Sequence, residues 1–231
     1  MSRHALITGA GTGIGAAIAK QLFNEGHNLS LIGRRLEPLA TLAETLGDSC
    51  KAITGDVTNR QSVEAAFSEA TANFGPVEIL INCAGVAPSA PFHRIEFEDW
   101  QKTLDVNLNG VFHCTQIALG DMKTAGWGRI VTIASTASLK GFAYVSGYCA
   151  SKHAALGLTR ALALETAQQG ITVNAVCPGY VDTDIVRESI QGIMAKTGRS
   201  EAEALLHFTQ SNPQGRLIEA DEVAASVSWL R

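Results

Sequence analysis

Six short apolar runs divide this chain into repeating units, each a predicted buried strand followed by a predicted helix. Between these runs, apolar residues recur three and four positions apart, which is the spacing of one helix face. Strands that alternate with helices predict a parallel sheet joined by right-handed crossovers, an α/β fold. The predicted strands occupy residues 4–8, 28–33, 50–55, 77–82, 128–135 and 171–176.

The helix predicted from Phe97 to about Lys123 has an apolar residue at every fourth position, which predicts a buried stripe along it. The stripe consists of Trp100, Leu104, Leu108 and Phe112. Asn107 and Asn109 lie in the same helix. Because asparagine is unfavourable inside a helix, one that turns inward is expected to have a hydrogen-bonding task.

Two further helices have recognisable limits. Thr58, followed by Gln61, has the form of a capping box, which predicts a helix from there to about Phe74. A long segment rich in Ala and Leu predicts another helix from Ser146 to about Gln169.

Composition indicates a single domain over residues 1–231. A hydrophobic fraction of 46% is enough for a substantial buried core. The net charge of −4 argues against a nucleic-acid partner, because phosphate binding needs clustered Lys and Arg. No run of about 18 apolar residues occurs, so no membrane partner is expected. The first residues show no signal peptide, so we expect a cytoplasmic protein. The cysteines lack the spacing of metal ligands, so we expect reduced thiols and no metal.

The first predicted strand is followed at once by the loop GAGTGIG and then by a helical pattern. In this context a glycine loop places the positive end of a helix dipole against a dinucleotide pyrophosphate. Gly9 would form the tight turn, Gly13 would let the phosphates approach, and Gly15 would let the helix pack closely on the strand. The loop therefore predicts a dinucleotide cofactor.

The second predicted strand ends with Gly33, Arg34 and Arg35, where an acidic residue would normally hold the adenosine ribose hydroxyls of NAD. A guanidinium can pair with a 2′-phosphate, so NADP(H) is favoured and NAD(H) remains possible. The alternative is that both arginines form the solvated start of a helix.

Other polar residues follow the predicted strands at the same edge of the sheet, where ligands of open α/β folds bind. Asp56 could accept a hydrogen bond from an adenine amino group or could be a local cap. The segment from Asn82 to Gly85 would bring backbone close to the cofactor, and CPGYVDTD forms another turn at this edge.

Tyr148 and Lys152 are four residues apart, so on a helix they share one face. A nearby cation stabilises a phenolate and lowers the pKa of the phenol toward neutral pH. Ser135 lies at the end of an apolar run upstream of this pair. Together the three groups suit carbonyl reduction, although a Tyr and Lys at this spacing are often only a surface pair.

In order along the chain stand TGAGTGIG, NCAG, DVNLNG, Ser135, YCASK and PGYVDT. With these motifs the chain resembles a short-chain dehydrogenase/reductase over nearly its whole length. The resemblance implies a Rossmann-like, doubly wound parallel sheet of six or seven strands with helices on both faces. It also implies a homo-oligomer, a tetramer or dimer.

The resemblance implies that Tyr148 is the general acid or base and that Ser135 positions the substrate oxygen. Lys152 would hold the nicotinamide ribose hydroxyls and lower the pKa of Tyr148, and Asn107 would anchor a water of the proton relay. Thr12 stands where NADP-dependent members often have a basic residue, which weakens the NADP prediction. The implied cofactor-binding residues are Gly9, Thr12, Gly13, Ile14, Gly15, Arg34, Arg35, Asp56, Val57, Asn82, Ala84, Gly85, Tyr148, Lys152, Pro178, Gly179, Val181 and Thr183.

Within the family, the segments around Ser135, Tyr148 and Pro178 are most similar to ketoreductases of polyketide and β-ketoacyl metabolism, including acetoacetyl-CoA reductases. This implies a small carbonyl or alcohol substrate, such as a 3-oxoacyl group on CoA or a carrier protein. An NAD-dependent 3-hydroxyacyl or 3-hydroxybutyrate dehydrogenase is the alternative. Such dehydrogenases hold a free carboxylate with Gln, His and Lys. The matching residues here are Ala87, Ala137 and Val145.

Two regions raise further expectations. The segment from about 184 to 212 is rich in apolar residues and is expected to form a substrate lid. The sequence ends after SVSWLR, where family members continue into a seventh strand, so we expect an exposed edge at the sixth strand.

A cofactor-binding regulatory protein without turnover is the alternative from another functional class.

Overall fold

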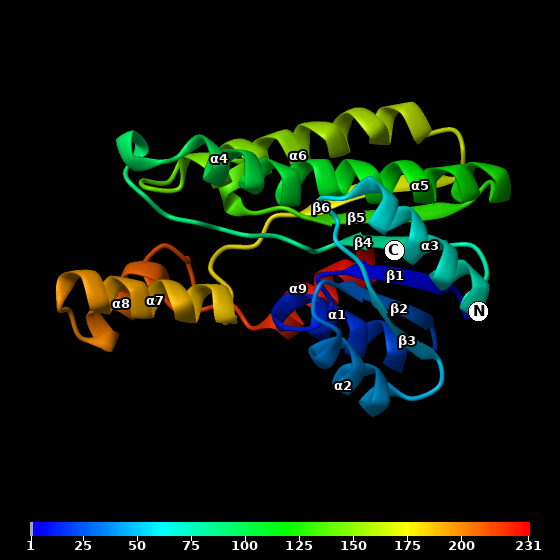
Figure 1. The fold of residues 1–231 in the computed structure, drawn as a ribbon, viewed down its shortest axis with the longest axis horizontal. Helices are drawn as coiled ribbons and strands as arrows, with labels where there is room; N and C mark the ends of the chain where they lie inside the picture. Colours follow the sequence, from blue (N-terminus) through cyan, green and yellow to red (C-terminus); the bar gives the residue numbers. More distant parts are fainter. Residues whose placement is uncertain (1) are drawn as a thin grey trace.

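The computed structural model describes residues 2–231, which are built around one sheet of six parallel strands (Figure 1). Its strand order is β3-β2-β1-β4-β5-β6, so β3 and β6 form the two edges. The predicted Rossmann-like doubly wound sheet is confirmed, with six strands in the described residues. The strands are β1 (His4–Thr8), β2 (Asn28–Gly33), β3 (Cys50–Thr54), β4 (Ile79–Asn82), β5 (Gly128–Ile133) and β6 (Ile171–Val176).

Helices cover both faces of the sheet because its strands bury side chains on both sides. In β1, Ala5 and Ile7 face one core cluster while Leu6 faces the other, and all are fully buried. One layer consists of α1 (Gly13–Asn24), α2 (Leu36–Leu46) and α9 (Ala220–Leu230) (Figure 1). The opposite layer consists of α3 (Arg60–Phe74), α4 (Phe97–Leu104), α5 (Gly110–Ala125) and α6 (Ser146–Thr166).

The chain leaves β1 toward β2 and β3, then returns to place β4 on the other side of β1. This reversal is the topological switch point, and its crevice lies outside the carboxyl ends of β1 and β4. The predicted cofactor loops follow these ends. The fold therefore brings them to one edge of the sheet.

The predicted helix from Phe97 to Lys123 is interrupted. A π-helical turn at Asp105–Asn109 separates α4 from α5 and carries the buried side chain of Asn107. Such turns insert one extra residue into a helix and are frequent at functional sites. The sequence pattern alone gave no sign of this insertion.

The predicted buried stripe on this helix is wrong. Phe112 is 46% exposed, and the other three stripe residues are only half-buried. The extra residue of the π turn rotates α5 relative to α4, so other positions face the sheet. The residues that are buried instead are Val106, Val111, Cys114 and Ala118.

The predicted start of α3 is wrong by one residue. The cap is Asn59, whose side chain accepts a hydrogen bond from the Ser62 amide at 3.0 Å. Thr58 instead donates its amide and hydroxyl to Asp56 Oδ1, at 3.0 and 2.8 Å. Asp56 thus has the local turn role that the sequence left open. Its other carboxylate oxygen, Oδ2, takes no part in these two hydrogen bonds.

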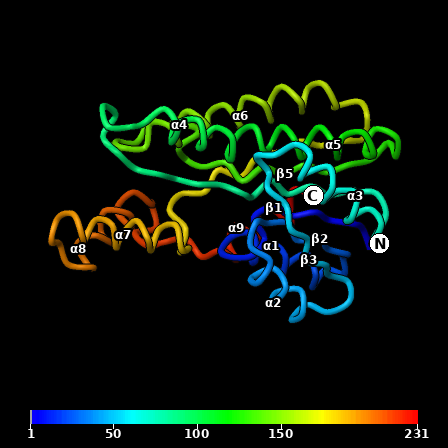
Figure 2. The backbone as a smooth tube through the Cα atoms, in the orientation of Figure 1, coloured from blue at the N-terminus to red at the C-terminus, as the bar shows by residue number. Residues whose placement is uncertain are grey.

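The segment predicted as a lid forms α7 (Asp184–Thr197) and α8 (Glu201–Thr209), which project from the body of the molecule (Figure 2). A small apolar cluster of their own holds the two helices together. It is built on Val186, Ile190, Ala204 and Phe208. That these helices cover a substrate stays a prediction.

Candidate active site

The glycine loop after β1 contacts two other predicted site loops. Gly9 has a positive φ of 67°, and a Cβ there would lie 2.8 Å from Ala84 Cα, so only glycine fits this turn. A Cβ on Gly13 would lie 3.1 Å from the Thr183 side chain. Thr12 is the N-cap residue of α1, so the free backbone amides of the next residues, including Ile14, lie where the glycine loop contacts the loops after β4 and β6.

The loop after β4 is fixed to β1 through one hydroxyl. Thr8 Oγ1 accepts hydrogen bonds from the amides of Cys83 and Ala84, at 3.0 and 3.1 Å. Asn82 is buried, and its amide nitrogen donates to Thr115 Oγ1 at 3.1 Å. Its Oδ1 is buried and has no hydrogen-bond partner among the described residues.

Asn107 uses its amide to join this loop to α6. Oδ1 accepts from the Val86 amide at 2.9 Å, while Nδ2 donates to the Val86 carbonyl at 2.9 Å and to Ser151 Oγ at 3.0 Å. Both amide hydrogens are therefore committed to protein groups. The water predicted at Asn107 would have to bind outside these contacts, and its presence stays a prediction.

Lys152 lies at the centre of the cluster and is only 6% exposed. Its ammonium group donates to the Ile133 carbonyl at 2.7 Å, at the end of β5. A Cβ on Gly85 would lie 3.7 Å from Lys152 Nζ and 3.3 Å from Asn107 Oδ1, so this glycine leaves room for both groups. Burial lowers the pKa of Lys152 to about 8, although the nearby Cys83 and Cys177 thiols oppose that shift.

Tyr148 faces the same region, with its ring centre 5.8 Å from Lys152 Nζ. Burial raises the pKa of Tyr148, and the interaction with the Ser135 hydroxyl opposes this shift. The expected lowering of this pKa by Lys152 is wrong for the chain alone, because burial dominates. The phenol is therefore protonated at neutral pH and can donate a proton.

Ser135 follows β5 and caps a short 3-10 turn, accepting the Ala137 amide at 3.1 Å. The next amide, of Thr136, donates to the Pro178 carbonyl at 2.8 Å. This hydrogen bond joins the serine loop to the turn after β6. The loop after β5 and the loop after β6 are therefore held side by side.

The turn from Pro178 to Thr183 closes the other side of the cluster. Val181 is buried and forms an isolated parallel β-bridge with Ile218. Thr183 donates its hydroxyl to the Val181 carbonyl at 3.3 Å. Gly179 packs directly against Asn212. Because Thr183 contacts the glycine loop, this turn lies between the two predicted ends of the cofactor.

The predicted adenosine end lies beyond β2 and β3. Arg34 and Arg35 are both exposed, and neither pairs with a carboxylate within residues 2–231. Asp56 is half-buried after β3, while Val57 is buried against Gly110. Two unpaired guanidinium groups suit a phosphate, and a buried valine suits an apolar wall for a base.

Sequence reasoning missed Ser151, which is fully buried between two site residues. Its hydroxyl accepts from Asn107 and donates to the Tyr148 carbonyl at 2.8 Å. The available signal was its place beside Lys152 in YCASK, on the face that turns inward. Ser151 therefore links the π turn to the helix that carries Tyr148.

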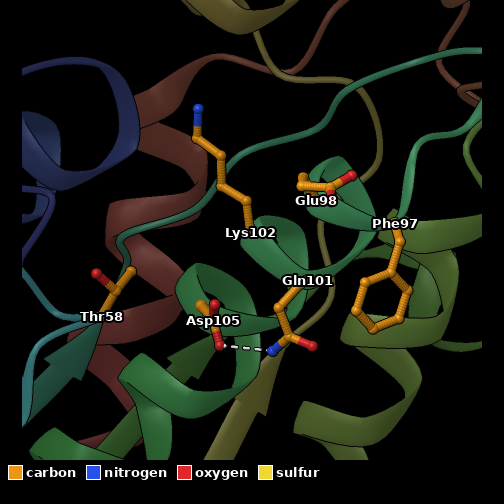
Figure 3. Close-up of a pocket in the computed structure, with 6 residues that line it drawn as sticks. All are labelled: Thr58, Phe97, Glu98, Gln101, Lys102 and Asp105. Atoms are coloured by element: carbon orange, nitrogen blue, oxygen red, sulfur yellow. Dashed lines mark hydrogen bonds between the residues drawn. The ribbon is translucent and has the colours of Figure 1, made fainter.

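A separate surface hollow of about 430 Å³ lies beside α4 (Figure 3). The Gln101 amide donates to the Asp105 carboxylate at 2.9 Å inside it. Its lining contains no residue of the predicted catalytic set, so we give it no part in the chemistry. The lining residues are Thr58, Phe97, Glu98, Gln101, Lys102 and Asp105.

Two further searches concern metals and membranes. Among the described residues, no three His, Cys, Asp or Glu side chains gather where they could hold a metal ion. None of the helices between residues 2 and 231 has the length and apolar character needed to cross a membrane.

Residues 3–193 match the family model described as short chain dehydrogenase. The chain is 39% identical to a protein named as a ketoacyl reductase of the monensin polyketide synthase of Streptomyces virginiae, covering 99% of this chain and 90% of the relative. It is 37% identical to an acetoacetyl-CoA reductase of Rhizobium meliloti, covering 100% of this chain and 91% of the relative. It is also 35% identical to a D-β-hydroxybutyrate dehydrogenase of Cupriavidus necator, covering 99% and 90%.

Two solved structures are similar over 99% of this chain and 90% of theirs. A variant of actinorhodin polyketide ketoreductase with NADPH superposes with a TM-score of 0.95 at 38% identity. A 3-ketoacyl-(acyl-carrier-protein) reductase from Brucella melitensis, complexed with NADH, superposes with a TM-score of 0.88 at 28% identity.

Proposed function

The chain belongs to the short-chain dehydrogenase family, and on this premise we propose that it reduces the ketone of a 3-oxoacyl thioester or related β-keto compound, using NADPH. The family and its relatives make the protein an NAD(P)-dependent oxidoreductase acting on CH–OH groups. The names of two relatives, a ketoacyl reductase and an acetoacetyl-CoA reductase, support the β-keto class.

The observation that carries this proposal is the group formed by Tyr148, Lys152 and Ser135 at one edge of the sheet. Burial raises the pKa of the Tyr148 phenol, so this group is protonated at neutral pH and available as the proton donor for reduction. The ammonium group 5.8 Å from the ring centre favours the phenolate left after proton transfer. The Ser135 hydroxyl beside the phenol supplies a second donor for the same substrate oxygen.

In the proposed reaction, Tyr148 donates its proton to the keto oxygen while a hydride adds to the keto carbon. The carbonyl π bond breaks, C–H and O–H bonds form, and the tyrosine phenolate regains a proton from solvent. NADPH, when bound, supplies the hydride. Asn107 and Ser151 hold α6 against the loop after β4, which keeps Tyr148 and Lys152 in place.

The residues present fit a nicotinamide dinucleotide. Gly9 and Gly13 leave a compact turn at the amino end of α1, which is suited to a pyrophosphate. The unpaired Arg34 and Arg35 would bind a 2′-phosphate, and this favours NADPH over NADH. Lys152 would hold the ribose hydroxyls next to the nicotinamide.

The test is a carbonyl panel assayed with NADPH and with NADH by the loss of reduced cofactor. The panel contains acetoacetyl-CoA, longer 3-oxoacyl thioesters and cyclic ketones. We expect the highest kcat/KM with NADPH and a β-keto substrate. Tight NADPH binding with no oxidation across the whole panel would instead support a regulatory protein.

A second candidate is NAD-dependent oxidation of 3-hydroxybutyrate, supported by the 35% identity to the Cupriavidus enzyme. The side chains of Ala87, Ala137 and Val145 offer no charge or hydrogen bond to a free carboxylate, which counts against it. Assay of 3-hydroxybutyrate with NAD⁺ separates the candidates, because we expect turnover far below that of the β-keto thioesters.

A further inference from the structure

Ser151 is a fully buried residue of α6 whose hydroxyl takes part in two hydrogen bonds. It accepts from Asn107 Nδ2 at 3.0 Å and donates to the Tyr148 carbonyl, three residues earlier in the same helix, at 2.8 Å. A hydroxyl has one hydrogen to donate and a carbonyl can only accept, so the direction of both bonds is set. One hydroxyl thus connects the Asn107 side chain to the backbone of Tyr148.

The Asn107 amide is held in place by groups outside α6. Its Oδ1 accepts from the Val86 amide and its Nδ2 donates to the Val86 carbonyl, both at 2.9 Å. Asn107 is fully buried in the π turn, and Val86 belongs to the loop after β4. Because two backbone contacts fix the amide plane, Asn107 offers its second hydrogen to Ser151 from a set position.

The first turn of α6, which carries Tyr148, gains little stability from its own residues. The N-cap residue is Val145, whose apolar side chain cannot accept from the free amides of that turn as Ser or Asp would. Residues 146–149 include no acidic side chain to interact with the helix dipole. Tyr144, just before the cap, has a φ of 67°, which residues other than glycine rarely adopt. The position of Tyr148 therefore depends on contacts with other elements.

Two hydrogen bonds tie this part of α6 to other elements. Lys152 reaches the Ile133 carbonyl at 2.7 Å, at the end of a long side chain with several rotatable bonds. The Ser151 oxygen is attached directly to Cβ, so its bond to Asn107 leaves the helix backbone much less freedom. The bond from Ser151 to the Tyr148 carbonyl then carries this restraint to the residue that holds the phenol.

We propose that Ser151 is a positioning residue, through whose hydroxyl the Asn107 side chain sets the place of the Tyr148 phenol against the keto oxygen. This inference rests on the proposed function, because it takes Tyr148 as the proton donor. It gives the Asn107 amide a task in the reaction besides the predicted water. A misplacement of about 1 Å can lower a rate about 100-fold, so the loss of this one hydroxyl should be visible in kcat.

The test compares Ser151→Ala with Thr159→Val as the matched control. Thr159 is also buried in α6, and its hydroxyl donates to the Ala155 carbonyl at 2.9 Å. Each variant removes a buried hydroxyl that donates to the helix backbone one turn earlier, but the Ser151 hydroxyl also accepts from another element. We measure kcat and KM with NADPH and the β-keto substrate that wild type reduces fastest. Fluorescence titration with NADPH counts the binding sites, so that kcat is expressed per folded site.

We expect Ser151→Ala to lower kcat per site about 10- to 100-fold and to leave KM for NADPH within about threefold of wild type. Thr159→Val should keep kcat within about twofold. A role in stability alone would reduce the number of NADPH sites and leave kcat per site unchanged, which would overturn the inference. If Ser151→Ala does not fold, Ser151→Cys is measured in the same way, because a thiol has a similar size and forms weaker hydrogen bonds. A wild-type kcat in that variant would also overturn the inference.

A double-mutant cycle with Asn107→Ala tests the route from Asn107 through Ser151. If Ser151 acts through Asn107, adding Ser151→Ala to Asn107→Ala should lower kcat by less than about a further twofold. Independent losses that multiply in the double variant would show that Ser151 does not act through Asn107, and the proposed route would be wrong.

The same assays separate this inference from the proposed function. If wild type reduces a β-keto compound, Tyr148→Phe loses that activity and Ser151→Ala keeps it, only the assignment of Ser151 is overturned. If wild type reduces no compound of the panel, or Tyr148→Phe keeps the activity, the proposed function or its proton donor is wrong and this inference is wrong with it.

Discussion

The proposed catalytic edge of the sheet and the predicted lid, α7 and α8, are built in different ways. At the sheet edge, Asn107 and Lys152 are buried and hydrogen-bonded to backbone, and the loops around them are joined to one another. The lid helices α7 and α8 share a small apolar cluster and project from the main core. Asn212 joins the two ends of that segment.

This difference separates two tasks. In the proposed reaction, the groups that transfer a proton have to be held accurately, and displacing them would break several hydrogen bonds of the main core. A lid with its own small core can shift or change sequence at lower cost in free energy. We therefore expect changes at the edge to alter the chemical step and changes in the lid to alter substrate binding.

The largest expected effect is on the chemical step. Tyr148→Phe removes the proposed proton donor while keeping the ring, so kcat should fall by about 10²- to 10⁴-fold. NADPH binding, followed by fluorescence titration, should stay close to wild type because Lys152 is retained. A kcat within about threefold of wild type would show that the proton comes from another group.

A pair of core truncations tests the difference in stability. Leu80 is fully buried in the sheet core, so Leu80→Ala should lower the free energy of unfolding by about 2–5 kcal/mol. Ile190→Ala removes a similar side chain from the lid cluster and should raise KM with little change in the global unfolding midpoint. Urea unfolding monitored by circular dichroism measures the stability of both variants, and steady-state kinetics measures KM. Equal losses would show that the lid unfolds together with the core.

A smaller effect is expected at the cofactor end of the edge. Arg34→Ala should lower kcat/KM for NADPH about 10- to 100-fold and leave that for NADH within about threefold, because only NADPH carries the 2′-phosphate. Arg160→Ala, an exposed arginine on α6, is the control. Unchanged NADPH preference in Arg34→Ala would count against the assigned phosphate contact.

The smallest effect concerns pH and stability. The folded-state pKa of Lys152 is about 8, below its unfolded value, so between these values the unfolded chain binds more protons. The contribution of Lys152 to the free energy of unfolding should therefore rise with pH through this window, by at most about 1.4 kcal/mol between pH 8 and 9, while Cys50, Cys83 and Cys114, whose pKa values burial raises to about 12, contribute in the opposite direction.

The matched variants are Lys152→Met, which should lose this rise, and Lys196→Met in the exposed part of the lid, which should keep it. Urea titrations at the two pH values measure the difference against wild type. An identical slope in Lys152→Met would show that Lys152 is not the group that titrates.

Much of this arrangement could be predicted because short patterns determine it. The glycine loop, NCAG and PGYVDT each follow an apolar strand, so their place at one sheet edge follows from parallel topology alone. The spacing of Tyr148 and Lys152 likewise predicts a shared helix face. These features depend on few residues that are close together in the chain.

Other features depend on contacts between distant segments and could not be predicted. The π turn at Asp105–Asn109 follows from Asn107 reaching Val86 and Ser151, which lie in other elements. The direction of the Tyr148 pKa shift was predicted wrongly because it depends on how deeply α6 is buried. Tyr180 stands inside PGYVDT, but its ring contacts with Phe142 and Phe208 could not be predicted, since those two residues come from separate segments.

The central claim is that this sheet edge delivers a hydride to the keto carbon of a β-keto compound. The most direct measurement uses NADPH carrying deuterium at both C4 positions and ethyl acetoacetate, with mass spectrometry and NMR of the product. We expect ethyl 3-hydroxybutyrate with one deuterium on C3 for each NADPH oxidised. Product without deuterium at C3, or no product with any β-keto compound tested, would contradict the claim.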